Sequence, residues 1–239
     1  MVATKCRFGI YRRAPSALLF ELIYIGLMLA IVVASAARGG TAEVHRSAVG
    51  FFAWMLFAMV GMSGMESIMG AAAAGTLEKM LSGPMRHVTI ILGEIVSSAV
   101  VGLLRWSIAF AVLATVVRIP LHLSLATVVT LALLIAFLLA LGVGLSGLSL
   151  VVRRTINIGS YLQLAMLGLA LMASSQTAFA RPLALFPYTL AIRLLGAPSI
   201  TAGDLVTLAL GTLITAVLAG VVFTWADRRA LRRGLLSVY

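Results

Sequence analysis

Four charged residues interrupt long apolar stretches of this 239-residue sequence, where an ionised side chain is costly and is therefore a candidate for function. They are Glu21, Glu66, Glu94 and Arg105. At 1.5 Å per helical residue, each carboxylate lies roughly 7 Å from the nearer end of its stretch, where it can reach interfacial water. Arg105 lies roughly 22 Å inside its own stretch. It can line a cavity, cap carbonyls or pair across helices, or extend outward to the surface.

The sequence lacks the motifs of common nucleotide-binding and hydrolytic enzymes. A phosphate-binding loop needs a lysine directly after a glycine, and neither Lys5 nor Lys79 follows one. No Gly-x-Ser-x-Gly turn and no His-Glu-x-x-His helix is present. Cys6 is the single cysteine, and the three histidines are too scattered to suggest a metal site. We therefore expect no catalytic residue, no metal and no cofactor on this chain.

One glycine-rich stretch, 142–147, matches the dinucleotide-binding fingerprint Gly-x-Gly-x-x-Gly letter for letter. That fingerprint works only as a turn between a strand and an amphipathic helix. Here the stretch stands inside a long apolar run, where small residues let helices approach one another closely. Helix packing is therefore the expected role of these glycines.

The composition places the helices in a membrane. The chain is 62% hydrophobic and 10% charged, whereas soluble domains are about 25% charged. A membrane-spanning helix needs about 20 apolar residues, so a chain of this length has room for about six. We expect an all-α integral membrane protein in which residues 1–239 form one transmembrane domain. Soluble enzyme folds, all-β folds and disordered tails are excluded.

Six apolar stretches are long enough to span a bilayer: 16–36, 50–70, 89–117, 121–152, 156–175 and 205–226. The first has a rival interpretation, because Ala34-Ser35-Ala36 after a basic start resembles the cleavage site of a signal peptide. Its apolar run of about 21 residues is longer than the roughly 7 to 15 of cleaved signals, and it contains a glutamate. We therefore expect a retained helix.

A short outer element is expected between the last two spans, in residues 176–203. Three prolines interrupt this segment, and the residues between them remain apolar. It is too broken to span the bilayer and too apolar for a solvated loop, so a re-entrant or interfacial element is expected. Its candidate functional residues are Phe186, Pro187 and Arg193.

The net charge of +11 reports orientation in the membrane. With the N-terminus inside, twelve of the 18 Lys and Arg residues lie in cytoplasmic segments and five lie outside. This bias predicts that the interfacial segment 1–15 and the basic tail 227–239 are both cytoplasmic. Anionic lipid can add to the attraction of these bases for the membrane surface, and no nucleic-acid partner is expected.

The cytoplasmic segment between the second and third spans predicts a two-turn helix over 76–87. Thr76 is placed as its N-cap, Glu78 favours its positive start, and Gly83-Pro84 ends it. Leu77, Met80 and Leu81 make one apolar face at helical spacing. The helix either rests on the lipid surface or is presented to a cytoplasmic partner.

The stretch Gly-Thr-Leu-Glu-Lys-Met-Leu-Ser-Gly-Pro, 75–84, with Leu92-Gly93 after it, resembles a segment of type-2 permeases of ATP-binding-cassette exporters. Phe186-Pro187-Tyr188-Thr189 with Arg193 resembles the element before the last helix of that family, and the basic tail after Ala226 is also similar. The chain departs from the family in the four alanines before Gly75 and in Glu94, where a lysine is common.

The resemblance implies a subunit of the bacterial inner membrane that pairs with a second or related permease and with a separate ATPase, which holds the ATP and Mg²⁺. It implies that 76–87 couples to the ATPase, through Thr76, Leu77, Glu78, Met80, Leu81, Pro84 and Met85. The four intramembrane charges would then belong to a translocation pathway for an exported amphipathic, lipid-linked or drug-like substrate. The alternative is a membrane-embedded enzyme or an assembly scaffold without an ATPase.

Overall fold

The computed structural model describes residues 26, 30, 43–76, 87–117, 124–151, 155–174 and 183–232, and this part of the chain is all helical. A helical stretch over 43–56 continues into a π-helix and then into α3. The elements that follow 43–56 are η1 (Phe57–Gly61), α3 (Ser63–Ala73), α5 (His87–Val117), α6 (Leu125–Val151), α7 (Thr155–Ser174), α8 (Pro187–Leu195) and α9 (Ala202–Arg232). The all-α expectation is confirmed for the described residues.

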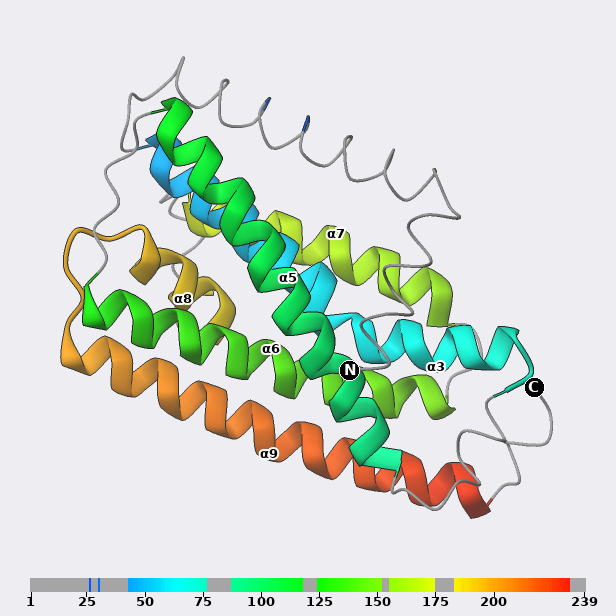
Figure 1. Ribbon diagram of the computed structural model, residues 1–239. Helices are drawn as coiled ribbons and strands as arrows, with labels where there is room; N and C mark the ends of the chain where they lie inside the picture. The colour runs from blue at the N-terminus through cyan, green and yellow to red at the C-terminus, as the bar shows by residue number, and fades with distance from the viewer. Residues whose placement is uncertain are drawn as a thin grey trace.

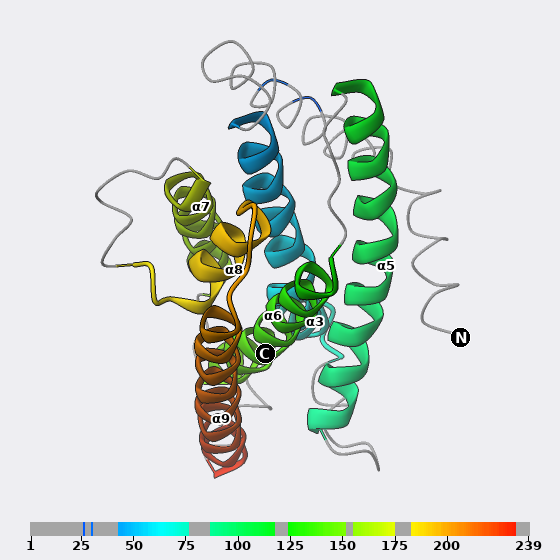
Figure 2. The same cartoon turned by 90° about the vertical axis from the view of Figure 1, so that its left-hand side faces the viewer.

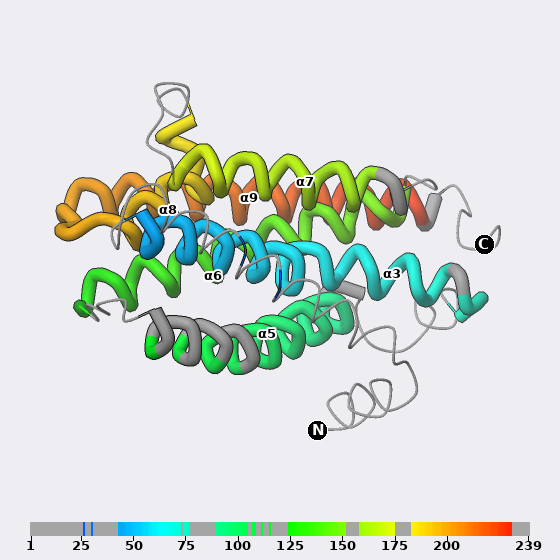
Figure 3. The backbone as a smooth tube through the Cα atoms, turned by 90° about the horizontal axis from the view of Figure 1, so that it is seen from above, coloured from blue at the N-terminus to red at the C-terminus, as the bar shows by residue number. Residues whose placement is uncertain are grey.

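The long helices alternate in direction, so the described bundle has two ends (Figures 1 and 3). One end, which we name the α8 end, holds the starts of the stretch at Glu43, of α6 and of α9, together with α8. The other, the α3 end, holds the C-terminal ends of α3, α6 and α9 and the N-terminal ends of α5 and α7. In Figure 2, α7 and α9 lie on one side, α5 on the other, and α3 and α6 between them.

Three described helices are long and apolar enough to cross a membrane: Glu43–Ala72, Leu125–Val151 and Ala202–Ala230. They correspond to the expected spans 50–70, 121–152 and 205–226. The first is longer than expected because the helix already begins at the charged residue Glu43, before the apolar run. Two further apolar helical stretches, Thr89–Leu104 and Ile158–Ser174, are shorter. The expected span 16–36 lies outside the described residues, apart from positions 26 and 30.

The glycines of 142–147 pack α6 against its neighbours. A Cβ built on Gly147 would lie 2.7 Å from Cα of Phe223 in α9, and one on Gly144 would lie 3.3 Å from Cβ of Ala219. A Cβ on Gly142 would lie 3.1 Å from the carbonyl oxygen of Val60. Only residues without a side chain allow backbones to approach this closely. The packing interpretation of the glycine-rich stretch is confirmed.

The π-helix η1 interrupts the span Glu43–Ala72 near its middle, and nothing in the sequence predicted it. A π-turn inserts one residue into the helix and displaces the backbone carbonyls around it. Those of Val60 and Gly61 face Gly142 of α6, and Ser63 Oγ donates to the Val60 carbonyl at 3.0 Å. The two halves of this span are therefore joined by a deformed turn that is seated directly on α6.

Large apolar side chains remain exposed on the outer helices. On α5 they recur at every fourth residue: Leu92, Val96, Val100, Leu104 and Ile108. Similar faces lie on α7 and α9, whereas the core is built mainly on the Glu43–Ala72 helix. Exposed apolar faces of this extent indicate contact with lipid or with other chains, in agreement with a membrane protein.

Candidate functional site

The short helix α8 is the centre of the candidate site at the α8 end. Seven of its nine residues are buried, and its neighbours are α6, α7 and α9. Phe186 precedes it in an extended conformation, and Pro187 takes the first helical position, where its missing N–H costs nothing. The Thr189 hydroxyl donates to the Phe186 carbonyl at 2.9 Å and also contacts the Leu183 carbonyl. The sequence expected a short element in 176–203, and a short helix lies there.

Packing fixes the position of α8 from two sides. The ring of Phe186 meets Phe137 of α6 edge-on, with ring centroids 5.6 Å apart. A Cβ on Gly211 of α9 would lie 2.7 Å from Cγ of Pro187, so that glycine makes room for the proline. Both Phe186 and Pro187 are therefore anchoring residues of the outer element.

A pocket of about 290 Å³ opens beside α8 and is lined by three charged residues. Arg193 is the exposed residue of α8, and it lines the pocket with Arg46, from the start of the Glu43–Ala72 helix, and Asp204, from the first turn of α9. The Arg46 side chain lies across the turn after α8, because a Cβ on Gly196 would be 3.2 Å from Cγ of Arg46. Residues far apart in the sequence thus meet at one site.

One oxygen of the Asp204 carboxylate, Oδ2, is bonded to the start of α9. It accepts the Thr201 hydroxyl at 2.6 Å and the Thr201 N–H at 3.3 Å, while the Asp204 N–H donates to the Thr201 hydroxyl at 3.2 Å. These are the reciprocal bonds of a capping box. The two guanidinium groups therefore outweigh the carboxylate, and the pocket favours an anionic group.

Tyr188 is the most buried large side chain of α8. Burial raises the pKa of its phenol above the ordinary value, so the hydroxyl stays neutral. Within the described residues that hydroxyl has no hydrogen-bond partner. The Tyr188 ring fills space in the core of the described bundle.

At the α3 end, the helix α3 closes with a Schellman motif at the start of the expected coupling segment. Gly75 has φ +66°, its N–H donates to the Ala72 carbonyl at 3.1 Å, and the N–H of Thr76 donates to the Ala71 carbonyl at 2.9 Å. The Thr76 hydroxyl also donates to that Ala71 carbonyl, at 3.3 Å. Thr76 therefore ends α3 in this structure. The rest of the coupling segment, from Leu77 through Arg86, lies outside the described residues.

Of the four intramembrane charges, the structure describes the side chains of two, Glu66 and Glu94. Glu66 is exposed in the first turn of α3, and Glu94 is half-buried on α5, a helix that packs on α3. Arg105 lies in the interior of α5, although its side chain is outside what is described, and Glu21 lies outside the described residues altogether. Their assignment to a pathway stays a prediction.

Two members of the charged pocket, Arg46 and Asp204, were missed by reasoning from the sequence. Thr201 and Asp204 stand at capping-box spacing, which was readable as a helix start. Nothing in the sequence signalled that Arg46, counted as an outer base, would lie against the turn after α8. No group of acidic, histidine or cysteine side chains in the described part of the chain is arranged to hold a metal ion.

Comparison with models of protein families, with curated proteins and with solved structures gives no match to this chain. The functional argument therefore depends on the geometry and on the sequence motifs alone.

Proposed function

We propose that this chain is the membrane-spanning subunit of an ATP-driven exporter, which dimerises and couples to a separate ATPase. One observation carries the proposal. The segment that resembles the permease motif joins the C-terminal end of α3 to the N-terminal end of α5, at the same end of the bundle where α9 runs into its arginines. Bases gather on the cytoplasmic side of membrane proteins, where ATP is available.

The proposal requires six spans with both termini in the cytoplasm of a bacterial cell. Besides the three apolar helices, α5 with 31 residues and α7 with 20 would cross the membrane, at lengths of about 46 and 30 Å. The stretch 16–36 would be the sixth span. The α8 end would then face outward, and the charged pocket beside α8 would lie at the exit.

Coupling would act through α3 and α5, which flank the motif and pack on each other. A push on the segment 76–87 would be transmitted along both helices as a rigid-body movement. In the span Glu43–Ala72, the deformed turn η1 separates the half at the α3 end from the half at the α8 end. This turn is where the two halves would change their relative orientation.

The substrate would be amphipathic, lipid-linked or drug-like. The helices of the described bundle offer mainly apolar walls, and most hydroxyl groups inside them already donate to carbonyls of their own helix, as Ser146 and Thr215 do. A small polar solute would find few partners there. The arginines of the pocket beside α8 would favour an anionic head group on its way out.

Affinity purification of the tagged chain from its native membrane tests the proposal. We expect a protein with a Gly-x-x-x-x-Gly-Lys-Ser/Thr motif to co-purify. Leu81→Asp should weaken its recovery at least tenfold, since burying a leucine contributes roughly 1.5 to 3 kcal/mol. Ser82→Asp adds the same charge without removing an apolar side chain and should retain the ATPase.

Two results would contradict the proposal. If no ATPase co-purifies with the unmodified chain, the membrane enzyme or scaffold becomes the better interpretation. If Leu81→Asp keeps its ATPase and its transport, the segment lies on lipid and does not couple. Orientation is tested separately with single cysteines at Ser35, Ser82 and Ser199 in a Cys6→Ser background. An impermeant thiol reagent should label the cysteines at positions 35 and 199 from outside and leave the cysteine at position 82 unlabelled.

A further inference from the structure

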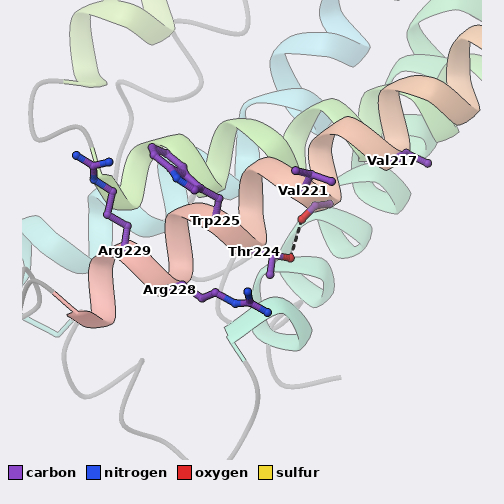
Figure 4. A pocket seen from close by; sticks show the side chains of 7 residues that line it. Val217, Val221, Thr224, Trp225, Arg228 and Arg229 are labelled. Atoms are coloured by element: carbon purple, nitrogen blue, oxygen red, sulfur yellow. Dashed lines mark hydrogen bonds between the residues drawn. The ribbon is translucent and has the colours of Figure 1, made fainter.

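The C-terminal part of α9 carries an open groove of about 810 Å³ that changes character along its length (Figure 4). Its described lining comes from one broad face of the helix: Val217, Gly220, Val221, Thr224, Trp225, Arg228 and Arg229. The apolar residues come first in the chain and the basic ones last. Over 217–228 the helix rises about 16 Å, roughly the length of a fatty acyl chain of a dozen carbons.

The first half of the groove can accept an alkyl chain. Val217 and Val221 are 59% and 62% exposed, so the described protein leaves their side chains uncovered. Between them, a Cβ added at Gly220 would meet no atom within 4 Å, so the absent side chain leaves open space along the helix. An acyl chain that lies along these valines would cover their exposed apolar surface.

The second half of the groove is cationic and aromatic. The Arg229 guanidinium lies 5.1 Å from the ring centroid of Trp225, within the range of a cation–π contact, and Trp225 remains half exposed. Figure 4 shows Trp225 and Arg229 together on one side of the helix and Arg228 extended on the other. Within the described residues, the buried Nε of Arg229 has no hydrogen-bond partner. The Thr224 hydroxyl already donates to the Gly220 carbonyl at 2.7 Å, so the arginines are the donors free for a ligand.

The position of this gradient matches the edge of a bilayer. The span Ala202–Ala230 has 29 residues and a length of about 43 Å, which exceeds the roughly 30 Å of the hydrocarbon core. We assign the excess to its last turns, because the tryptophan and the arginines there are favoured in the head-group region. The arginines lie at the depth of lipid phosphates, and the valines lie at the depth of acyl chains.

We propose that this groove binds one anionic phospholipid, with its phosphate at the extended Arg228, one acyl chain along Val217 and Val221, and Arg229 adding a second positive charge from the other side of the helix. Charge complementarity favours lipid over a second copy of the chain. A two-fold axis along the membrane normal would bring the same arginines of both copies together, and like charges repel. The inference needs only a membrane around the protein, so it stands apart from the proposed transport function.

Native mass spectrometry of the purified protein in neutral detergent tests the head-group contact, with phosphatidylglycerol and phosphatidylcholine of the same acyl chains as probes. We expect phosphatidylglycerol to bind more tightly. The double variant Arg228→Gln, Arg229→Gln should lose about fivefold in affinity per arginine, or about 25-fold in all, with little change for phosphatidylcholine. Thr207→Gln, which puts the same new side chain at an exposed position near the other end of α9 and changes no charge, is the control and should bind as the unmodified protein does.

A second variant tests the acyl chain and keeps the inference falsifiable if the arginine variants misfold. Gly220→Phe fills the groove without touching its charges, and Gly168→Phe on α7 is the control, since a Cβ there also meets nothing within 4 Å. Gly220→Phe should weaken phosphatidylglycerol binding, and Gly168→Phe should not. Glycerol 3-phosphate, which has no acyl chains, should bind far more weakly than the lipid.

Three results would overturn the inference. If the Arg228→Gln, Arg229→Gln variant bound phosphatidylglycerol as tightly as the unmodified protein, the proposed contact between the arginines and the phosphate would be wrong. Glycerol 3-phosphate binding as tightly as the lipid would show a site for free phosphate. A Gly220→Phe protein that binds lipid normally but changes its oligomeric state would show that a second copy of the chain covers the groove.

Discussion

Replacing Gly147 with alanine should separate the two most closely packed helices of the described bundle. The added methyl would stand 2.7 Å from Cα of Phe223, whereas carbon atoms in contact prefer about 3.5 to 4.0 Å. The obstacle is a backbone atom, which no rotamer change can move. To restore a normal contact distance, α6 and α9 must separate by about 1 Å or bend. Overpacking of this kind costs about 1 to 3 kcal/mol.

Helix propensity acts in the opposite direction and sets the control. Alanine is favoured over glycine inside a helix by about 1 kcal/mol, so Gly147→Ala should lose roughly 0 to 2 kcal/mol in all. At Gly168 the added Cβ meets no atom within 4 Å, so Gly168→Ala should show only the stabilisation from the higher helix propensity of alanine. The gap between the two variants is then about 1 to 3 kcal/mol, or roughly 2 to 12 °C in Tm at 2 to 4 °C per kcal/mol.

Thermal unfolding in detergent, followed by tryptophan fluorescence, measures this gap. Gly144→Ala gives an intermediate case, because its Cβ would meet a side-chain methyl, Cβ of Ala219, at 3.3 Å. We expect Tm to fall in the order Gly168→Ala, Gly144→Ala, Gly147→Ala. A Gly147→Ala protein as stable as Gly168→Ala would refute the close approach of α6 and α9, and with it the packing role of the glycine-rich stretch.

Four further predictions follow from single contacts. Gly75→Ala should lower the free energy of unfolding by about 1 kcal/mol, because a φ of +66° disfavours a residue with a Cβ. Gly70→Ala is the control, since it lies inside α3 with open space around an added Cβ and should not destabilise the protein. Comparing the Tm values of the two variants tests this. Thr201→Ala should cost about 1 kcal/mol through the lost cap of α9, measured in the same assay. Tyr188→Phe should leave Tm unchanged or raise it, because the described structure gives the buried hydroxyl no partner to lose; a large fall in Tm would reveal one. Arg105→Met, which keeps bulk and removes charge, should reduce transport and substrate-stimulated ATP hydrolysis, and normal values of both would exclude a pathway role.

The expected segment boundaries show where reasoning from one sequence reaches its limit. The apolar runs located the three candidate spans, because a helix that is apolar all round has no other stable environment. The start at Glu43 was missed, because a helix can continue past its apolar run into polar residues whenever its backbone bonds remain satisfied. Thr76 was predicted as the N-cap of the helix 76–87, and this stays a prediction because the segment from Leu77 lies outside the described residues; its hydroxyl bonds to the Ala71 carbonyl of α3.

The sequence by itself determined that this is a helical membrane protein, which stretches are apolar, and that the glycines of 142–147 pack helices, because each of these follows from composition and periodicity within one segment. Only the tertiary structure decided which helices those glycines contact, that η1 deforms a span opposite Gly142, and that Arg46 meets Arg193 and Asp204 in one pocket. The physical reason is that such contacts join residues far apart in the sequence: Gly142 and Val60 are 82 positions apart, and Arg46 and Asp204 are 158 positions apart. They depend on the crossing of packed helices, which a pattern along one segment does not record.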